Sequence, residues 1–217
     1  NYASQCKTQR FLLASSVEVY GENRGDTEYF DETYCGYIDC NTLRAGYPES
    51  KRASEALCQA YKKANQLDVV IARLARTYGP TMLLSDTKAI SQFIKNGLAK
   101  EDIVLKSEGN QLYSYNYVAD SVSGLLTILL KGKNGEAYNI SDQASDITLR
   151  DLARIIAGFT GTNVVFNLPD EVESVGYSKA TKALMDSSKL QMLEWMAHWD
   201  IKKGLQETLN HLDIKDI

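Results

Sequence analysis

The segment between Arg10 and Leu74 most constrains the fold, because two short apolar runs flank one long helical pattern. The runs at residues 10–16 and 68–74 are bounded by polar residues, which is typical of strands buried on both faces of a sheet. The intervening helix is predicted at residues 47–66. The stripe of this helix that we expect to be buried consists of Ala53, Leu57, Ala60, Tyr61 and Ala64. A strand, a helix and a second strand in this order predict a right-handed crossover between parallel strands.

Shorter elements follow Pro80 and predict a second, smaller α/β lobe. We expect helices at residues 89–98, 118–130, 149–160 and 200–212, and strands at residues 102–106, 113–117, 136–140 and 164–166. Thr148 and Asp151 have the spacing of a capping box. Residues 1–8 look like the end of a helix, and the polar residues 22–42 predict a long surface loop. The predicted fold is therefore α/β. Residues 1–80 belong to a parallel sheet, and residues 81–217 mainly form the smaller lobe, with some segments returning to the first sheet.

Composition excludes several classes of function. The 217 residues, 44% of them hydrophobic, suffice for one large domain with a buried core, or for one and a half. A net charge of −4 with interspersed acids and bases argues against a nucleic-acid partner. No apolar run reaches the length of a membrane span, and no signal peptide opens the chain. The four cysteines show no metal-ligand spacing, so we expect no metal site, reduced thiols and a cytoplasmic location.

Tyr47 and Lys51 are the first candidates for chemistry, because a Tyr-x-x-x-Lys pair on a helix places both side chains on one face. Pro48 suits the first helical turn, so Tyr47 is expected where the helix begins. A phenol with a pKa near ~10 is a poor base at neutral pH, but a nearby ammonium stabilises its phenolate. Tyr47 could then take a proton from an alcohol or return one to a carbonyl. An ordinary helix stays the alternative, because about one such pair is expected by chance among 13 Tyr and 24 Lys and Arg residues.

Ser15, Ser16 and Glu18 follow the first strand, and the ligands of open parallel sheets collect at the carboxyl ends of strands. These side chains are therefore candidate site groups. In the alternative interpretation, the serines cap the strand end and Glu18 is only solvated. Arg76 follows the second strand in the same way and is a further candidate.

Five features of the sequence occur in one characteristic order and spacing. They are Leu12-Leu13-Ala14-Ser15-Ser16-Val17-Glu18-Val19-Tyr20-Gly21, Tyr47-x-x-x-Lys51 with Arg52, Arg73-x-x-x-x-Tyr78-Gly79-Pro80, Tyr117-Val118-x-Asp120, and Leu193-x-Trp195 before the last helix. Together they resemble the extended short-chain dehydrogenase/reductase family of NAD-dependent nucleotide-sugar epimerases, dehydratases and decarboxylases. The resemblance implies that residues 1–80 are the C-terminal part of an NAD-binding Rossmann domain, and that residues 81–217 mainly bind the nucleotide sugar. The family's Gly-x-x-Gly-x-x-Gly turn is absent, so we expect a C-terminal fragment that is inactive alone.

The resemblance also implies a role for each candidate residue. Tyr47 takes the proton of the sugar 4-hydroxyl, Lys51 holds the tyrosinate, Ser16 hydrogen-bonds the same oxygen, and Glu18 is a catalytic acid or base. The cofactor is NAD, for which the implied binding residues are Ala14, Ser15, Tyr47, Lys51 and Leu74. The substrate is a nucleotide-diphosphate sugar, for which the implied binding residues are Ser16, Glu18, Arg44, Arg76 and Tyr113. The full-length protein is expected to be a homodimer that pairs through the helix carrying Tyr47.

The residues around Glu18 bear on which reaction follows oxidation of the sugar. Dehydratases of the family carry Asp-Glu where this chain has Val17-Glu18, and valine cannot donate a proton. UDP-glucuronate decarboxylases keep the Glu but lack the Asp. Like this chain, they also have an Arg shortly before the active Tyr, here Arg44, and a Lys-Arg pair, here Lys51 and Arg52. Decarboxylation is therefore the nearest match, with a dTDP-glucose 4,6-dehydratase-like reaction ranked close to it. A UDP-sugar 4-epimerase, a non-catalytic nucleotide-sugar binding protein and an atypical reductase of small carbonyls stay alternatives.

Arg76 and Tyr113 depart from the family pattern. Arg76 stands where the family has an Asn that helps to bind the diphosphate, and Tyr113 stands where it has an Arg. We hypothesise that Arg76 replaces the lost cation at a phosphate or a carboxylate, because a guanidinium fork suits either group. The alternative is that Arg76 pairs with an acid of a nearby loop.

Overall fold

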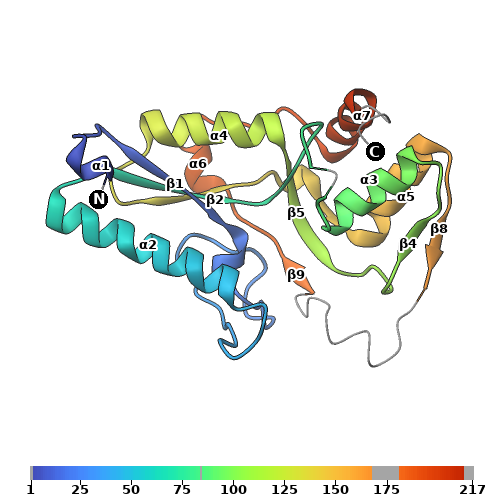
Figure 1. Cartoon of the computed structure of the whole chain (residues 1–217), viewed down its shortest axis with the longest axis horizontal. Helices are drawn as coiled ribbons and strands as arrows, with labels where there is room; N and C mark the ends of the chain where they lie inside the picture. Colours follow the sequence, from blue (N-terminus) through green and yellow to red (C-terminus); the bar gives the residue numbers. More distant parts are fainter. Residues whose placement is uncertain (1, 84, 168–180, 213–217) are drawn as a thin grey trace.

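The computed structural model describes residues 2–83, 85–167 and 181–212. Figure 1 shows an elongated molecule in which one half contains a sheet between helices and the other half a lobe of short strands and helices. The helices are α1 (Tyr2–Gln5), α2 (Gly46–Asn65), α3 (Ala89–Leu98), α4 (Val118–Lys131), α5 (Leu149–Thr160), α6 (Ser188–Gln191) and α7 (Ile201–His211), with short 3₁₀ turns η1 (Val17–Tyr20) and η2 (Gln143–Ser145). The strands are β1 (Phe11–Ser16), β2 (Val69–Leu74), β3 (Arg76–Tyr78), β4 (Ile103–Leu105), β5 (Leu112–Tyr117), β6 (Ala137–Ile140), β7 (Asp146–Thr148), β8 (Val164–Phe166) and β9 (Lys182–Ala183).

The first sheet has the order β1-β2-β6, and both of its strand pairs are parallel. The predicted strand–helix–strand unit is confirmed, since α2 connects β1 to β2 and lies on one side of the sheet while α4 lies on the other (Figure 1). Ser16 is the register partner of Leu74, so the two strands end together. This shared edge brings the residues that follow the two strands close together, and those that follow β1 also contact α2.

The predicted buried stripe of α2 is wrong. Ala53, Leu57, Ala60 and Ala64 are exposed, with Leu57 58% accessible, and Tyr61 is only partly buried. The side of α2 that meets the sheet instead carries buried Cys58 and polar side chains that bond to β1 and β2. A stripe of apolar residues indicates which side of a helix avoids water, but it does not say which neighbour covers that side.

The second lobe is built from two small sheets. β5 pairs with β3 and β9 in parallel and with β7 antiparallel, while β4 pairs in parallel with β8 and not with the next strand in the chain. The predicted helices and strands of this lobe are found within about two residues of their expected ends. The main hydrogen bond of the predicted capping box is confirmed, because the Thr148 hydroxyl accepts a hydrogen bond from the backbone N–H of Asp151.

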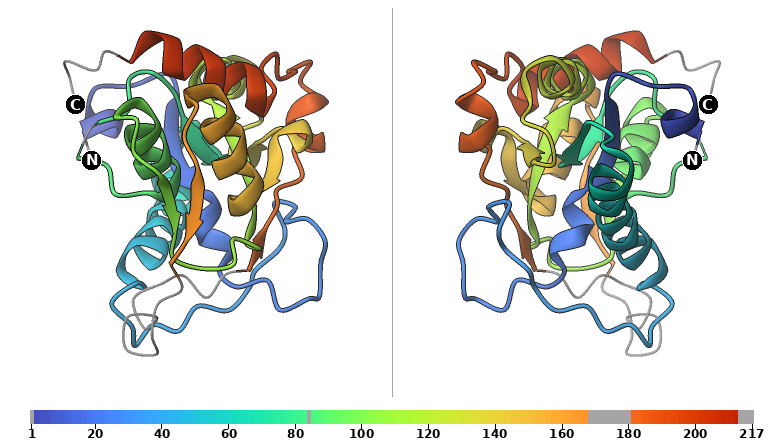
Figure 2. Two further views of the ribbon diagram at one scale, coloured as in Figure 1. Left: turned by 90° about the vertical axis from the view of Figure 1, so that its right-hand side faces the viewer. Right: turned by 90° about the vertical axis from the view of Figure 1, so that its left-hand side faces the viewer.

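The core is continuous between the two halves. One hydrophobic cluster includes Val17 and Val19 after β1, Tyr78 of β3, Tyr113 of β5 and Leu205 of α7. In both views of Figure 2, α4 and α7 lie at the top of the molecule, whereas α2 lies toward the bottom. β3, within residues 1–80, pairs with β5 of the second lobe, and β6 returns to the first sheet. The domain division at residue 80 stays a prediction.

In the described part of the chain, no helix has both the length and the apolar character needed to cross a membrane. Both histidines, His198 and His211, are exposed.

Candidate active site

The end of β1 places Ser16 at the shared strand edge, where only 9% of its surface is accessible. Ser16 caps η1, and its Oγ accepts a hydrogen bond of 3.2 Å from the backbone N–H of Glu18. The capping interpretation of this serine is therefore correct, yet a hydroxyl that accepts one bond still has its own O–H to donate. The Glu18 side chain is 45% accessible, so its carboxylate remains open to a ligand.

Tyr47 and Lys51 share one face of α2, as their spacing predicts. The Lys51 Nζ lies 5.6 Å from the centre of the Tyr47 ring and donates a hydrogen bond of 2.8 Å to the carbonyl oxygen of Ala14. The Tyr47 side chain is 54% accessible. Helix α2 begins at Gly46, so Pro48 occupies the first turn, where its missing N–H breaks no helical bond. The phenol and the ammonium are thus held close together at the strand edge.

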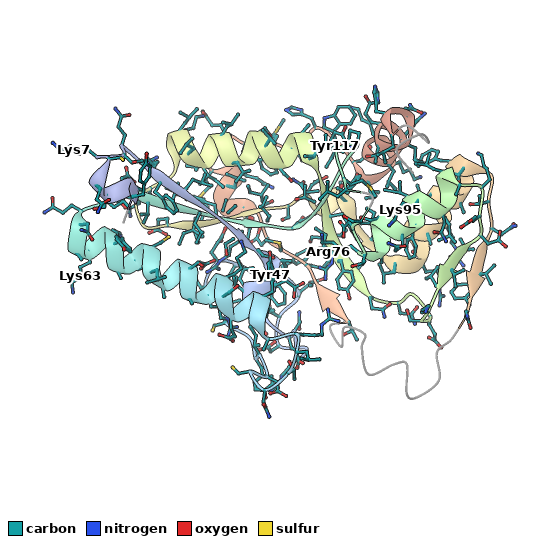
Figure 3. The ribbon with its side chains drawn as sticks, viewed as in Figure 1. Lys7, Tyr47, Lys63, Arg76, Lys95 and Tyr117 are labelled. Carbon is teal, nitrogen blue, oxygen red and sulfur yellow. The ribbon has the colours of Figure 1, made fainter. Side chains whose placement is uncertain are left out.

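Glu18, Arg76 and Tyr113 come from three elements and meet in one cluster. The Arg76 guanidinium carbon lies 3.6 Å from the centre of the Tyr113 ring, and Arg76 Nη2 lies 3.6 Å from Glu18 Oε1. β3 and β5 cause this stacking, because Arg76 is the register partner of Tyr115 and Tyr113 lies two residues away on the same face of β5. Arg76 Nη1 is buried and has no hydrogen-bond partner among the residues that the structure describes. Figure 3 shows Arg76 and Tyr47 in the middle of the molecule, where the two halves meet.

The other predicted site residues occupy different positions. Ala14 is exposed, and its carbonyl anchors Lys51. Ser15 is buried, and its hydroxyl donates a bond of 2.5 Å to Glu55 Oε1, so this side chain is occupied within the protein. Leu74 is partly buried, with its side chain packed against the apolar cluster under α4. Arg44 is exposed in the loop before α2.

Glu55 and Arg73 form a buried ion pair that the sequence reasoning missed. Arg73 donates two bonds to the Glu55 carboxylate, at 3.0 Å and 2.7 Å, and each side chain is only 13% accessible. Arg73 Nη1 also donates to the hydroxyl of Tyr20 at 3.0 Å. The spacing of four residues that relates Tyr47 to Lys51 continues to Glu55, and this repeat was the available signal.

Burial shifts the pKa of several groups around this pair. Burial raises the pKa of Tyr20 above its ordinary value, against the opposing effect of the Arg73 charge. Burial alone would lower the pKa of Arg73, but the hydrogen bonds and charge of Glu55 raise it overall. Arg73 therefore stays charged at any ordinary pH. Within the described residues, no group of three or more His, Cys, Asp or Glu side chains is arranged to hold a metal ion.

Comparison with known proteins identifies the relatives of this chain. UDP-glucuronic acid decarboxylase 2 of Arabidopsis thaliana is 30% identical over 196 residues, which are 90% of this chain and 42% of the relative. UDP-glucuronic acid decarboxylase 1 of Xenopus tropicalis is 29% identical over 202 residues, which are 93% of this chain and 46% of the relative. The chain thus spans less than half the length of these two relatives.

Solved structures share the fold. The UDP-glucose 4-epimerase of Thermotoga maritima, solved with UDP-glucose, matches with a TM-score of 0.83 at 22% identity, over 96% of this chain and 65% of that chain. The dTDP-glucose 4,6-dehydratase of Bacillus anthracis, solved with NAD, matches with a TM-score of 0.81 at 23% identity, over 97% of this chain and 63% of that chain. The family model described as "NAD dependent epimerase/dehydratase family" matches residues 1–141. The chain therefore belongs to the NAD-dependent epimerase/dehydratase family.

Proposed function

We propose that the full protein is an NAD-dependent enzyme that oxidises a nucleotide-diphosphate sugar transiently at C4, and that its reaction is closest to decarboxylation of a UDP-uronate. The observation that carries this proposal is the placement of Tyr47 and Lys51 on one face of α2 at the strand edge that ends in Ser16. The relatives named UDP-glucuronic acid decarboxylase support the choice of reaction.

The residues at this edge fit the nicotinamide-ribose end of NAD. Lys51 uses one N–H on the Ala14 carbonyl and keeps two for ribose hydroxyls, while exposed Ala14 leaves space beside the strand. When bound, NAD supplies the redox chemistry, accepting the C4 hydrogen with its electron pair and later returning it. The sequence holds no glycine-rich turn for the pyrophosphate, so the residues present account for one end of the cofactor only.

Proton transfer is the task of the chain's own residues. Lys51 favours the phenolate of Tyr47, which takes the proton of the C4 hydroxyl, and the Ser16 hydroxyl donates to the same sugar oxygen. The resulting C4 ketone lies β to a carboxylate on C5. The bond between C5 and the carboxylate carbon can then break, with carbon dioxide leaving and the electron pair passing to the C4 oxygen. Glu18 follows Ser16 by two residues and its side chain is 45% accessible, so it is available to exchange a proton with the sugar.

Position 17 supports decarboxylation over dehydration. Val17 is buried in the core, with 6% of its surface accessible, so neither its chemistry nor its location provides an acid to expel a hydroxyl group. Loss of carbon dioxide needs no such acid. Arg76 supplies a cation for the substrate, since its stacked guanidinium belongs to a side chain that is still 22% accessible and suits a carboxylate or phosphate oxygen.

The exposed stripe of α2 supports a homodimer. Leu57 and its alanine neighbours offer an apolar surface that a second copy of the helix would cover. A cytoplasmic location is also our proposal, supported by four cysteines that are all unpaired.

Mass spectrometry of the products that the full-length protein forms from UDP-, dTDP- and CDP-sugars tests the proposed function. A product from a UDP-uronate that is lighter by one carbon dioxide, made by the wild type and not by Tyr47→Phe, supports it. A change of configuration without a change of mass would assign a 4-epimerase instead. Absence of any turnover and of NAD reduction, in protein with bound NAD, would indicate a non-catalytic binding protein.

A further inference from the structure

We propose that Glu55 is a positioning residue, which fixes the Tyr47–Lys51 face of α2 against the strand end that carries Ser16. This inference rests on the proposed function, because it assigns to Glu55 the alignment of the proton-transfer groups. Glu55 lies one helical turn beyond Lys51 and two turns beyond Tyr47, on the same face of α2.

Glu55 joins α2 to both neighbouring strands. Its Oε1 accepts from the Ser15 hydroxyl of β1 at 2.5 Å and from Arg73 Nε of β2 at 3.0 Å, and its Oε2 accepts from Arg73 Nη2 at 2.7 Å. Ser15 and Arg73 are register partners in the sheet, so one carboxylate holds the two strands at the same level. Both oxygens of Glu55 are thus engaged by protein groups one residue before the ends of the strands.

Successive turns of α2 hold successive residues of β1. Lys51 bonds the carbonyl of Ala14, and Glu55 bonds the hydroxyl of Ser15, the residue before Ser16, so two turns of α2 are fixed against the end of β1. A slip of the helix by one turn, about 5.4 Å, would break both bonds. The contacts therefore define the position of α2 along β1 and not only its distance from the sheet.

The same network reaches the turn that contains Glu18. Arg73 Nη1 bonds the Tyr20 hydroxyl at 3.0 Å and the Glu32 carbonyl at 2.9 Å. The Tyr20 hydroxyl in turn donates to Asn139 Oδ1 of β6 at 2.6 Å. Tyr20 ends η1, so the Glu55–Arg73 pair holds α2 and the turn carrying Glu18 in one hydrogen-bonded unit.

The energetics of the Glu55–Arg73 ion pair favour a role in positioning α2 over a role in stabilising the fold. A buried ion pair loses in desolvation much of what it gains in attraction, and apolar residues of similar volume often stabilise a fold as well. Directed bonds at fixed lengths provide what apolar packing does not, which is one defined alignment of the helix and the strands. Misplacement of reacting groups by about 1 Å can cost about a hundredfold in rate.

The test compares Glu55→Gln with Asp68→Asn in full-length protein. Asp68 is a matched control, because it accepts two bonds from Arg10 at the opposite end of the same two strands, at 3.1 Å and 2.8 Å. We expect Glu55→Gln to lower kcat by about tenfold to a hundredfold with KM within about threefold of the wild type. Asp68→Asn should leave both kcat and KM unchanged, even if both variants lose thermal stability.

Tyr47→Phe separates the two proposals. If the Tyr47→Phe variant is inactive and the Glu55→Gln variant keeps the kcat of the wild type, the proposed function stands and the role of Glu55 is refuted. If it turns over normally, both proposals fall. If the Glu55→Gln variant does not fold, Arg73→Lys takes its place. This substitution keeps the positive charge but loses the bidentate contact with Glu55, so we expect the same results for it.

Discussion

Replacing Arg76 by alanine distinguishes a substrate-binding role from a structural one. Within the protein, Arg76 makes an ion pair of 3.6 Å with Glu18 and stacks on the Tyr113 ring at 3.6 Å. Because Glu18 is 45% accessible, the ion pair contributes about 0–1 kcal/mol to the free energy of unfolding. The stack contributes about 0.5–1 kcal/mol. Arg76→Ala should therefore lower the free energy of unfolding by no more than about 2 kcal/mol.

The expected loss in binding is larger. A charge-assisted hydrogen bond to a substrate anion contributes about 1.5–3 kcal/mol, which corresponds to an increase of about 10- to 150-fold in Kd. Arg76→Lys keeps the charge and loses the planar fork, so its Kd should lie between those of the wild type and Arg76→Ala.

Calorimetric titration with UDP-sugars, beside thermal unfolding of each variant, measures both effects. Arg154→Ala is the control for loss of one positive charge, because Arg154 makes an exposed ion pair with Asp151 on α5, in the second lobe. If Arg76→Ala binds the UDP-sugar with a Kd within twofold of the wild type, Arg76 does not contact the substrate anion. The role of Arg76 would then be limited to its ion pair with Glu18, which is the alternative stated in the sequence analysis.

Three further perturbations test the fold and its surfaces. Leu57→Glu should shift the full-length protein from dimer to monomer in sedimentation, and an unchanged dimer would remove α2 from the interface. Thr148→Ala should lower the free energy of unfolding in urea by about 1 kcal/mol through loss of the α5 cap, and no loss would argue against that bond. Burial raises the pKa of Asp146 from its ordinary value of 3.8 to about 6, so the folded state keeps a proton that the unfolded state releases. Stability should therefore fall as pH rises from about 4 to about 6, and melting temperatures of Asp146→Asn should lack this fall.

The positions of the helices and strands followed from periodicity, whereas the pairing of the short strands did not. Long elements such as α2 and α5 repeat a pattern often enough to be recognised. β7, β9 and α6 contain two to four residues, too few for a period to appear. The pairing of β4 with β8 joins segments about 60 residues apart, and no local feature of either strand specifies that partner.

The candidate site was predictable where one element carries two functional groups. Tyr47 and Lys51 follow from helical spacing alone, and the structure places them as that spacing requires. Tyr20 and Asn139 are 119 positions apart in the sequence, so their contact can be recognised only in the folded structure. Arg73 was recognisable in principle, because a charged residue inside an apolar strand needs a partner close by.

The error about the buried side of α2 and the oversight of Glu55 have one cause. We expected the apolar stripe of α2 to be buried, but the side that meets the sheet carries Lys51 and Glu55, which bond β1, while Tyr47 in the first turn is 54% accessible. This polar stripe can face inward because the Ala14 carbonyl, the Ser15 hydroxyl and the Arg73 guanidinium satisfy its charged groups. The apolar stripe is then left outward, where a partner helix could cover it. A helix beside a strand edge whose polar stripe contains an amine and a carboxylate is therefore expected to turn those groups toward the sheet, since the sheet offers the bonds that they require.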